Sequence, residues 1–344
     1  MKFWIVGLRS CIRNIIQKCN TCFKLNPKNS SPQMAALPKF RVQQAKAFAH
    51  TGVDYAGPFY LQVGVRKAAP RKAYLCLFVC LTTKALHLEL CSALSTDCFL
   101  NAFKRFLSRR GPCGTMHSDN GTNFIGAKNK LSELYELTLS PDFKEKINGE
   151  LTKRGIEWKF NPPSAPHFGG VWESQVKAVK TQLYRVIGEQ TLTFEELSTV
   201  LSQIEALLNS RPLCVMSNDP EAPSALTPAH FLTFGSTLEN LPAEDVTEEK
   251  LNRLSRFQLL DRLVQDFWKR WHQEYLTTLH PRQKWTASGN NLQPGTVVCV
   301  QQDNAPPLKW PLGLITEVHP GPDGIVRSAT VKLASGSLKR PVVK

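Results

Sequence analysis

The first half of the chain alternates short apolar runs with polar turns, a pattern that predicts β-strands. Residues 96–107 differ, because their apolar side chains recur at helical spacing and predict an amphipathic helix. Residues 172–187 and 194–208 predict two further helices, the second stopped by the polar and proline-containing residues 209–212. A run of strands followed by alternating helices and strands favours a mixed α/β layer over a β-sandwich. The predicted strands are residues 48–54, 74–81, 85–90, 114–118 and 156–160.

The pattern changes again toward both ends of the chain. Residues 250–276 are rich in Leu, Arg, Phe and Trp and predict a helical stretch. From residue 294 onward, short apolar runs alternate with Gly, Pro and Asp turns, which predicts a small β-barrel. The N-terminal segment is basic, contains one helical pattern and ends in a linker rich in Pro, Ser and Asn. The domain boundaries that follow are 1–38, 39–240, 241–285 and 286–344.

The net positive charge of the chain indicates which class of molecule it binds. A formal net charge of +15 over 344 residues and a pI near 9.4 favour a polyanion, with nucleic acid ahead of a merely basic soluble protein. No apolar run approaches the roughly 20 residues of a membrane-spanning helix, and charge interrupts the first residues too soon for a signal peptide. The ten cysteines are scattered, many inside apolar runs, which indicates buried thiols rather than a disulfide framework. We therefore expect an intracellular protein in a reducing compartment.

Three acids stand in unlike surroundings. Asp54 ends an apolar run and precedes Tyr-Ala-Gly-Pro, Asp119 lies in His-Ser-Asp-Asn-Gly-Thr-Asn-Phe, and Glu173 ends Phe-Gly-Gly-Val-Trp-Glu. The first two are predicted at strand ends and the third at the start of a helix. Carboxylates so placed could hold two Mg²⁺ ions roughly 4 Å apart, which clamp the attacking and leaving oxygens of a phosphodiester. Taken singly, each acid has a plainer interpretation, as a turn residue or as part of a solvated helix pair.

In this order and together, the three segments resemble the catalytic core of retroelement integrases, the Asp-Asp-Glu family with a ribonuclease H-like fold. The run from Phe168 to Glu173 is most similar to integrases of BEL/Pao long-terminal-repeat retrotransposons, and the resemblance spans about residues 2–340. The spacing from the second to the third acid exceeds that of retroviral integrases, and residues 126–152 predict a helical insertion that BEL/Pao-type sequences share. The resemblance implies an α/β fold: a mixed five-stranded sheet flanked by helices, a helical extension and a C-terminal SH3-like β-barrel.

The resemblance also implies what the site does. Asp54, Asp119 and Glu173 would be the catalytic residues and the ligands of two Mg²⁺ or Mn²⁺ ions. Water first attacks a phosphodiester near the 3′ end of the element's cDNA, and the freed 3′-hydroxyl then attacks target DNA. Both steps move a phosphoryl group between oxygens, so positioning and charge neutralisation suffice without a covalent enzyme intermediate. The implied partners are double-stranded DNA and further copies of the chain in a homo-multimer, with no membrane, and the implied location is the nucleus after cytoplasmic assembly.

Four polar residues near the acids are candidates for DNA contact. Asn120 and Asn123 flank the second acid and could orient a scissile phosphate, or could only stabilise a turn. Lys177 and Lys180 lie one and two helical turns beyond the third acid on the same face, where they could bind phosphates or form a solvated face. Residues 162–170 contain three Pro and two Gly. They predict an irregular loop before this helix, suited to gating DNA or to plain connection.

Cys19 and Cys22 form half of a structural zinc site, which needs four ligands. The resemblance implies a His-His-Cys-Cys module whose two histidines precede the cysteines, and no histidine stands before Cys19 in the sequence. His50 is the nearest candidate, but it lies on the predicted strand that leads to the first acid. We therefore expect that zinc does not bind, with truncation as the simplest account.

The C-terminal barrel resembles the SH3-like domain that ends these integrases. Its basic residues would give a sequence-independent phosphate footprint, and the basic balance disfavours the alternative of a peptide-binding SH3-like module. Trp285 and Trp310 are expected to pack in the core or at an edge rather than to stack on bases. The basic residues are Arg282, Lys284, Lys309, Arg327, Lys332, Lys339 and Arg340, of which Lys309, Lys339 and Arg340 are the DNA-binding candidates.

Three functions stay open at this point. The first is an integrase that processes and joins DNA. The second is a truncated or domesticated derivative that binds DNA without joining it, since an intact triad does not prove activity. The third is a ribonuclease H-type nuclease that cleaves but cannot join. The three are separable by their products: joined strands, bound DNA alone, or cleaved DNA alone.

Overall fold

The computed structural model divides the chain into two units, Met1–Lys39 and Phe40–Lys344. For residues 170–178 and 252 only the backbone is described. The residues described are 6–20, 38–62, 69–118, 125, 127–129, 156–160, 170–188, 190–217, 219, 223–233, 235, 238, 244–279, 291–302 and 305–342.

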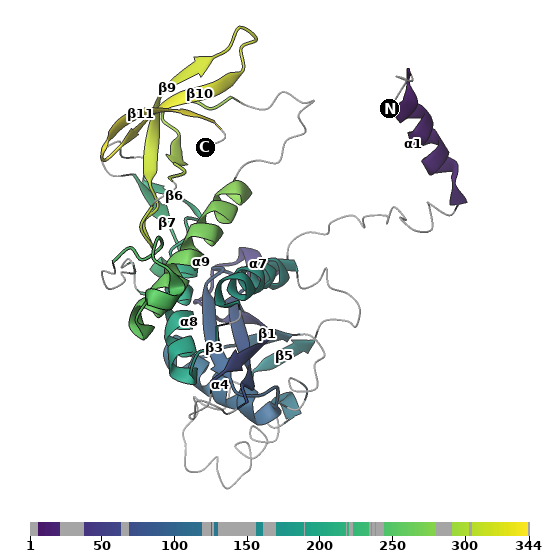
Figure 1. The fold of residues 1–344 in the computed structure, drawn as a ribbon, viewed down its shortest axis with the longest axis vertical. Coiled ribbons are helices and arrows are strands. Elements are labelled where there is room, and N and C mark those ends of the chain that lie inside the picture. Colours follow the sequence, from purple (N-terminus) through teal and green to yellow (C-terminus); the bar gives the residue numbers. More distant parts are fainter. Residues whose placement is uncertain are drawn as a thin grey trace. The chain divides into compact units, whose positions relative to one another are not determined.

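The first unit carries the helix α1 (Leu8–Lys18), which confirms the helical pattern predicted there (Figure 1). Its apolar side chains Ile12, Ile15 and Ile16 are exposed. Cys19 follows the helix as its C-cap, and its backbone N–H donates to the carbonyl oxygen of Ile16. The predicted partner cysteine, Cys22, lies outside the described residues.

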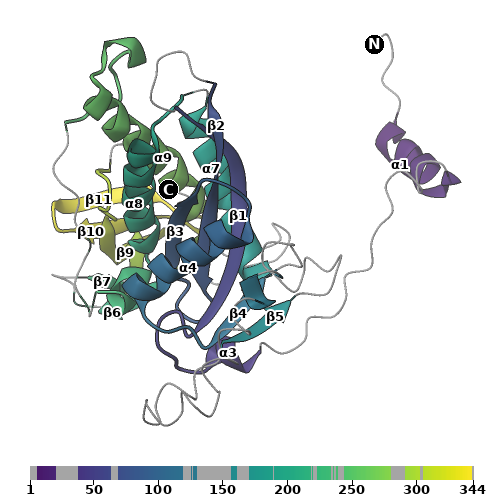
Figure 2. The same ribbon diagram turned by 90° about the horizontal axis from the view of Figure 1, so that it is seen from below.

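A mixed five-stranded sheet organises the second unit (Figures 1 and 2). The spatial order is β3-β2-β1-β4-β5, in which β2 is antiparallel to β1 and β3, and β4 is parallel to β1 and β5. This order and these directions fit the ribonuclease H-like core that the resemblance implies. The five predicted strands are all present, with bounds shifted by a few residues: β1 (His50–Leu61), β2 (Arg71–Cys80), β3 (Leu86–Cys91), β4 (Thr115–Ser118) and β5 (Glu157–Phe160).

Helices cover both faces of the sheet. Adjacent residues of a strand point to opposite faces, so Leu75 and Leu77 of β2 pack with one group of helices while Cys76 and Phe78 pack with another. Burial on both faces explains why β2 is an unbroken apolar run. None of the helices in the described part of the chain is long and apolar enough to cross a membrane. The first group is α7 (Gly170–Ile187), α8 (Phe194–Asn209) and α9 (Arg256–Leu279), and the second is α4 (Thr96–Arg110).

Side chains of α8 cover the free edge of the sheet at β3. The side-chain amide of Asn209 accepts from the N–H of Leu86 and donates to its carbonyl oxygen, both at 2.8 Å. A carboxylate oxygen of Glu205 accepts the N–H of Leu88 at 2.7 Å. An uncovered edge strand would expose unpaired backbone groups to other chains. The helix stop predicted at Asn209 is confirmed, and the same residue also completes the edge.

The C-terminal strands form an open antiparallel sheet rather than the predicted barrel. Their order is β11-β10-β9-β8, and no ladder joins β8 to β11 among the described residues. Closing a barrel requires the first and last strands to pair, but β8 has only three residues, all of them paired with β9. The strands are β8 (Val297–Cys299), β9 (Leu312–Pro320), β10 (Val326–Leu333) and β11 (Gly336–Pro341).

The segment that precedes β9 packs on the helices of the core. The indole N–H of Trp268, in α9, donates to the carbonyl oxygen of Ala305 at 2.7 Å, and that of Trp310 donates to the Ser210 hydroxyl at 3.1 Å. The rings of Trp268 and Trp310 meet edge to face at 5.0 Å and 75°. The expected packing role of Trp310 is therefore confirmed. The remaining short elements are β6 (Cys214–Ser217), β7 (Ser224–Leu226), η3 (Pro228–Phe231) and η4 (Leu251–Arg253), while α3 (Lys39–Val42) precedes β1.

Candidate active site

Asp54 lies inside β1, paired in register with Leu77 of β2. The predicted position at a strand end is wrong, because pairing with β2 carries the strand on to Leu61. On its other side β1 pairs with the shorter β4 only from His50 to Gly52. Asp54 therefore lies two residues beyond the last described pairing with β4, where that side of β1 faces the end of a neighbouring strand.

The second acid follows that neighbouring strand in the sequence. β4 ends at Ser118, whose hydroxyl oxygen accepts the indole N–H of Trp158 at 2.9 Å. Asp119, Asn120 and Asn123 lie outside the described residues. Their predicted roles in metal binding and phosphate orientation stay predictions from the sequence.

The third acid belongs to α7, which confirms the helix predicted there. The backbone of Glu173 and Lys177 is described, and their side chains lie outside the described atoms. At 3.6 residues per turn, positions 173, 177 and 180 share one face of the helix. Farther along α7, Val179 and Leu183 are buried in the core with the sheet, which fixes how the helix is turned.

An ion pair joins α7 to β1. The Lys180 ammonium lies 3.1 Å from Oδ2 of Asp54, and Oδ1 of the same carboxylate accepts the N–H of Tyr55 at 2.7 Å. The Lys180 and Asp54 side chains are 30% and 26% exposed, so the pair is accessible from solvent. The backbone thus orients the carboxylate while its second oxygen faces a cation. The helix face that carries the third acid is directed at the strand that carries the first.

The described residues contain no cluster of three or more His, Cys, Asp or Glu that could hold a metal ion. For the predicted zinc half-site, Cys19 is described and Cys22 is not. His50 makes a different contact, since its Nδ1 lies 2.7 Å from the Thr115 hydroxyl on β4. That contact gives the His50 ring a partner inside the sheet.

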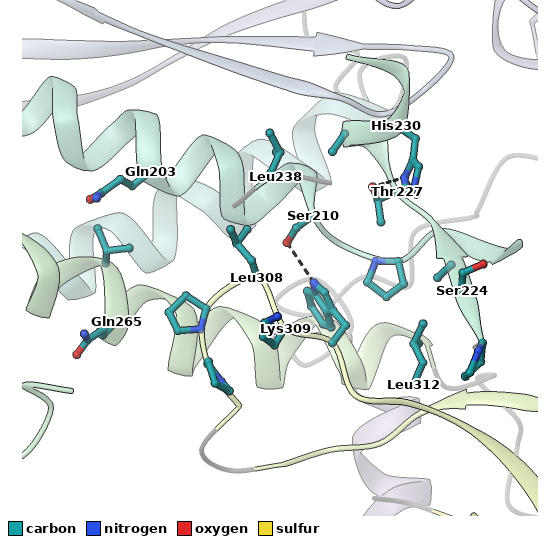
Figure 3. A pocket seen from close by; sticks show the side chains of 18 of the residues that line it. Gln203, Ser210, Ser224, Thr227, His230, Leu238, Gln265, Leu308, Lys309 and Leu312 are labelled. Carbon is teal, nitrogen blue, oxygen red and sulfur yellow. Dashed lines mark hydrogen bonds between the residues drawn. The ribbon is translucent and has the colours of Figure 1, made fainter. Parts of the chain in front are cut away.

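A cavity of about 710 Å³ lies at the junction of the core with the C-terminal segment (Figure 3). Side chains from α8, α9, β7, η3 and the segment before β9 line it, and Asp54 is not among its lining residues. Lys309, a predicted DNA contact, is exposed and lines this cavity. The other two predicted DNA contacts of this region, Lys339 and Arg340, are exposed on the edge strand β11.

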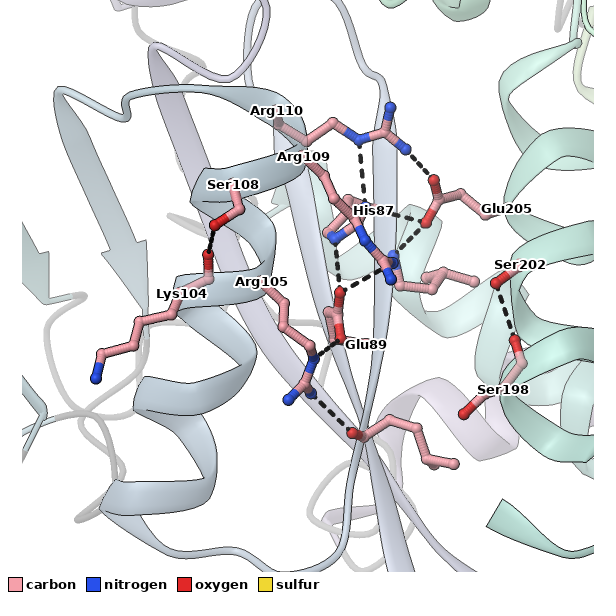
Figure 4. Close-up of polar contacts among 12 residues, drawn as sticks. His87, Glu89, Lys104, Arg105, Ser108, Arg109, Arg110, Ser198, Ser202 and Glu205 are labelled. Carbon is pink, nitrogen blue, oxygen red and sulfur yellow. Dashed lines mark hydrogen bonds and ion pairs between the residues drawn. The ribbon is translucent and has the colours of Figure 1, made fainter. Parts of the chain in front are cut away.

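A second group of charged residues lies between β3, α4 and α8 (Figure 4), with His87 and Glu89 buried and the other members partly exposed. His87 lies 3.1 Å from a carboxylate oxygen of Glu89 and 3.2 Å from one of Glu205. Arg105 donates to Glu89 at 2.6 Å, and Arg110 pairs with Glu205. Burial alone would lower the pKa of His87, but its hydrogen bonds to the two acids outweigh burial and raise it. We interpret this group as a structural tie between two helices and an edge strand, because its charges satisfy one another.

The contacts of His87 in this group predict that the stability of the fold depends on pH. A raised folded pKa means that His87 stabilises the fold fully below its unfolded value of 6.5 and progressively less as pH rises through the folded pKa. Replacing Glu205 with Gln removes the main contact that raises this pKa. We expect the stability gap between the wild type and Glu205→Gln to be largest below pH 6.5 and to narrow above it. Unfolding midpoints measured from about pH 5.5 to about pH 8.5 test this.

The comparison of two variants is necessary because other histidines act in the opposite direction. Burial lowers the pKa of His117 to about 4 and also lowers that of His272, so both favour the fold more as pH rises. The matched control is Glu195→Gln, an exposed acid on the same helix. A gap for Glu205→Gln that is constant over this pH range, like that of the control, would contradict the prediction.

The sequence missed two features of this region. Lys180 was predicted only as a DNA contact, although the spacing of 173, 177 and 180 already showed that they share a helix face. No sequence signal identifies its partner, since Asp54 and Lys180 are 126 positions apart. The cavity was not predicted either, because its walls come from segments that are distant in the sequence.

Comparisons with known proteins match either part of the chain or its structure at low similarity. A family described as of unknown function, DUF5641, matches residues 255–344, a segment that comprises α9 and the C-terminal sheet. No curated protein matches the chain. A chain of the simian T-cell lymphotropic virus intasome, solved with the PP2A regulatory subunit B56 gamma, is similar at 12% identity and a TM-score of 0.36, covering 96% of this chain and 88% of that one.

The catalytic core domain of HTLV-2 integrase in complex with magnesium is also similar. Its trimeric form gives 17% identity and a TM-score of 0.33, covering 55% of this chain and 99% of that one. Its dimeric form gives 16% identity and a TM-score of 0.32, with coverage of 54% and 97%. At TM-scores this low, the functional proposal rests on the residues and geometry of the chain itself.

Proposed function

We propose that this chain is a metal-dependent DNA integrase of the BEL/Pao type, which processes the 3′ ends of element cDNA and joins them to target DNA. The observation that carries the proposal is the contact between Lys180 and Asp54. It directs the face of α7 that bears Glu173 toward the strand that bears the first acid. Asp54 lies on β1 and the backbone of Glu173 lies on α7, while Asp119 follows β4 in the sequence.

The register of the parallel strands β1 and β4 supports the proposal that Asp119 belongs to the same metal site as Asp54. Described pairs join His50 to Thr115, Thr51 to Met116 and Gly52 to His117. Continued by two residues, the same offset leads from position 54 to position 119. A carboxylate at each of these positions would lie on the same face of neighbouring strands, because side chains alternate with a period of two.

The donor set fits a divalent cation. Oδ2 of Asp54 already has a positive group against it, the Lys180 ammonium, and the Tyr55 N–H keeps the carboxylate oriented. Carboxylate oxygens are the ligands that Mg²⁺ and Mn²⁺ prefer. Asp54, Asp119 and Glu173 would hold two such ions, which supply charge neutralisation and alignment of the attacking and leaving oxygens.

The remaining residues would bind and orient DNA. Asn120 and Asn123 would position the scissile phosphate, and Lys177 would hold the phosphates beside it. Exposed Lys339 and Arg340 would extend the phosphate footprint along β11, together with Lys309. Two DNA ends must be joined to one target, so the proposal includes a homo-multimer, acting in the nucleus after assembly in the cytoplasm.

The test is an assay of the purified chain with a labelled duplex that carries element ends and a supercoiled target. We expect joined products with Mg²⁺ or Mn²⁺ and none after the metal is removed with EDTA, because the metal ions would align the attacking oxygen and stabilise the leaving oxygen. Cleavage without joining would support a ribonuclease H-type nuclease instead. Binding without either reaction would support a domesticated DNA-binding derivative. Joining that continues in EDTA would overturn the metal-dependent mechanism.

A further inference from the structure

Binding of DNA by Lys180 does not explain why its side chain contacts Asp54. Lys180 was predicted to bind phosphate, yet its ammonium lies 3.1 Å from Oδ2 of the first acid. With the Tyr55 N–H at 2.7 Å from Oδ1, both oxygens of this carboxylate have a donor. The same lysine therefore stands where an incoming cation must compete.

A lysine ammonium and a divalent cation repel each other at one carboxylate oxygen, so they compete for it. Lysine suits such an exchange, because its charge is compact and sits at the end of a flexible four-carbon stem. The pair is partly exposed, so solvent screening keeps it weak. A contact of this strength can be exchanged, whereas a fully buried pair would hold its geometry.

We propose that Lys180 is a positioning residue that occupies Asp54 in the metal-free site and moves to a DNA phosphate when metal and DNA bind. The proposal rests on the proposed function, since it takes Asp54 as a metal ligand. In the free protein, Lys180 lowers the affinity of the site for metal while it keeps the carboxylate in place. In the presence of DNA, the phosphate takes the ammonium, and Oδ2 becomes available to the cation.

Such an exchange couples the two ligands. By linkage, DNA must raise the affinity for metal by the same factor by which metal raises the affinity for DNA. The part of this factor that comes from Lys180 disappears when the charge is removed. This exchange of Lys180 between Asp54 and a DNA phosphate would limit metal-dependent chemistry to chains that already hold their DNA substrate.

The experiment measures Mn²⁺ affinity of the full chain by calorimetry, with and without a saturating duplex that cannot react. Without DNA, Lys180→Gln should bind Mn²⁺ about fivefold more tightly than the wild type, which is the upper range for an exposed pair. Lys180→Arg keeps the charge and should restore affinity to near the wild-type value. With DNA present, the advantage of Lys180→Gln should vanish, so its enhancement by DNA is smaller by the same factor.

The matched control is Arg185→Gln, which removes a positive charge from the same helix. Arg185 pairs with Glu274 at 3.3 Å, and both side chains are about half exposed. It should leave Mn²⁺ affinity unchanged. Equal or weaker Mn²⁺ binding by Lys180→Gln without DNA would overturn the exchange, as would an equal gain in the Arg185 variant.

A further variant, Asp54→Asn, separates an error in the proposed metal site from an error in the role of Lys180. Asp54→Asn should abolish tight Mn²⁺ binding if Asp54 is a ligand. If Asp54→Asn binds Mn²⁺ as the wild type does, the metal site itself is wrong. If it loses Mn²⁺ while Lys180→Gln is unchanged, the metal site stands and only the role of Lys180 is wrong.

Discussion

Asp54→Asn is expected to reduce strand joining by about 100-fold or more, since outer-shell partners of a metal already cost roughly 10–100-fold when mutated. The substitution keeps the size and the hydrogen-bonding oxygen of the side chain but removes the negative charge that faces Lys180. The N–H of Tyr55 can still donate to the amide oxygen. The fold should therefore persist while the chemistry is lost, as measured by joined product per unit time at saturating Mg²⁺.

The control for Asp54→Asn is Asp266→Asn in α9. Asp266 is 31% exposed and pairs with Arg262 at 2.9 Å, which closely matches the exposure and pairing of Asp54. It lines neither the candidate site nor the cavity. Asp266→Asn should join DNA at nearly the wild-type rate. If Asp54→Asn did so too, the assignment of Asp54 as a metal ligand would be wrong.

Trp268→Ala is expected to destabilise the second unit by about 3–5 kcal/mol, the usual cost of truncating a buried aromatic residue. Trp268 is 3% exposed and packs edge to face on Trp310. Its indole N–H also donates to the carbonyl oxygen of Ala305, which the substitution would leave without that donor. The measurement is the shift in urea or thermal midpoint of the purified chain.

Two variants separate packing from hydrogen bonding at this position. Trp268→Phe retains most of the ring but loses the donor, so it should cost about 1–3 kcal/mol. Phe257→Ala lies in the same helix but is 72% exposed, and it should change stability by less than about 0.5 kcal/mol. A Trp268→Ala effect as small as that of Phe257→Ala would mean that the segment before β9 does not pack on α9 in solution.

The elements of the core could be predicted from the sequence because their signals are local. Period-two and period-3.6 patterns identify strands and helices from neighbouring residues alone. The apolar run of β2 predicted a strand, whereas its burial between α4 on one face and the group of α7, α8 and α9 on the other came from the structure. The barrel was predicted from similar short strands, yet whether such strands close depends on the pairing of the first with the last. Among the described residues that pairing is absent, and the sheet is open.

For the candidate site too, the sequence determined some features and the tertiary structure decided others. The order of Asp54, Asp119 and Glu173 and the helix face shared by 173, 177 and 180 were determined by the sequence, since motif order and helical spacing are properties of the chain itself. That Asp54 lies inside a long strand beside the end of a shorter one was decided by strand pairing. That Lys180 meets Asp54 across 126 positions was decided by the packing of α7 on the sheet. Local patterns specify which residues share a face, but only the buried contacts of the whole core specify what that face meets.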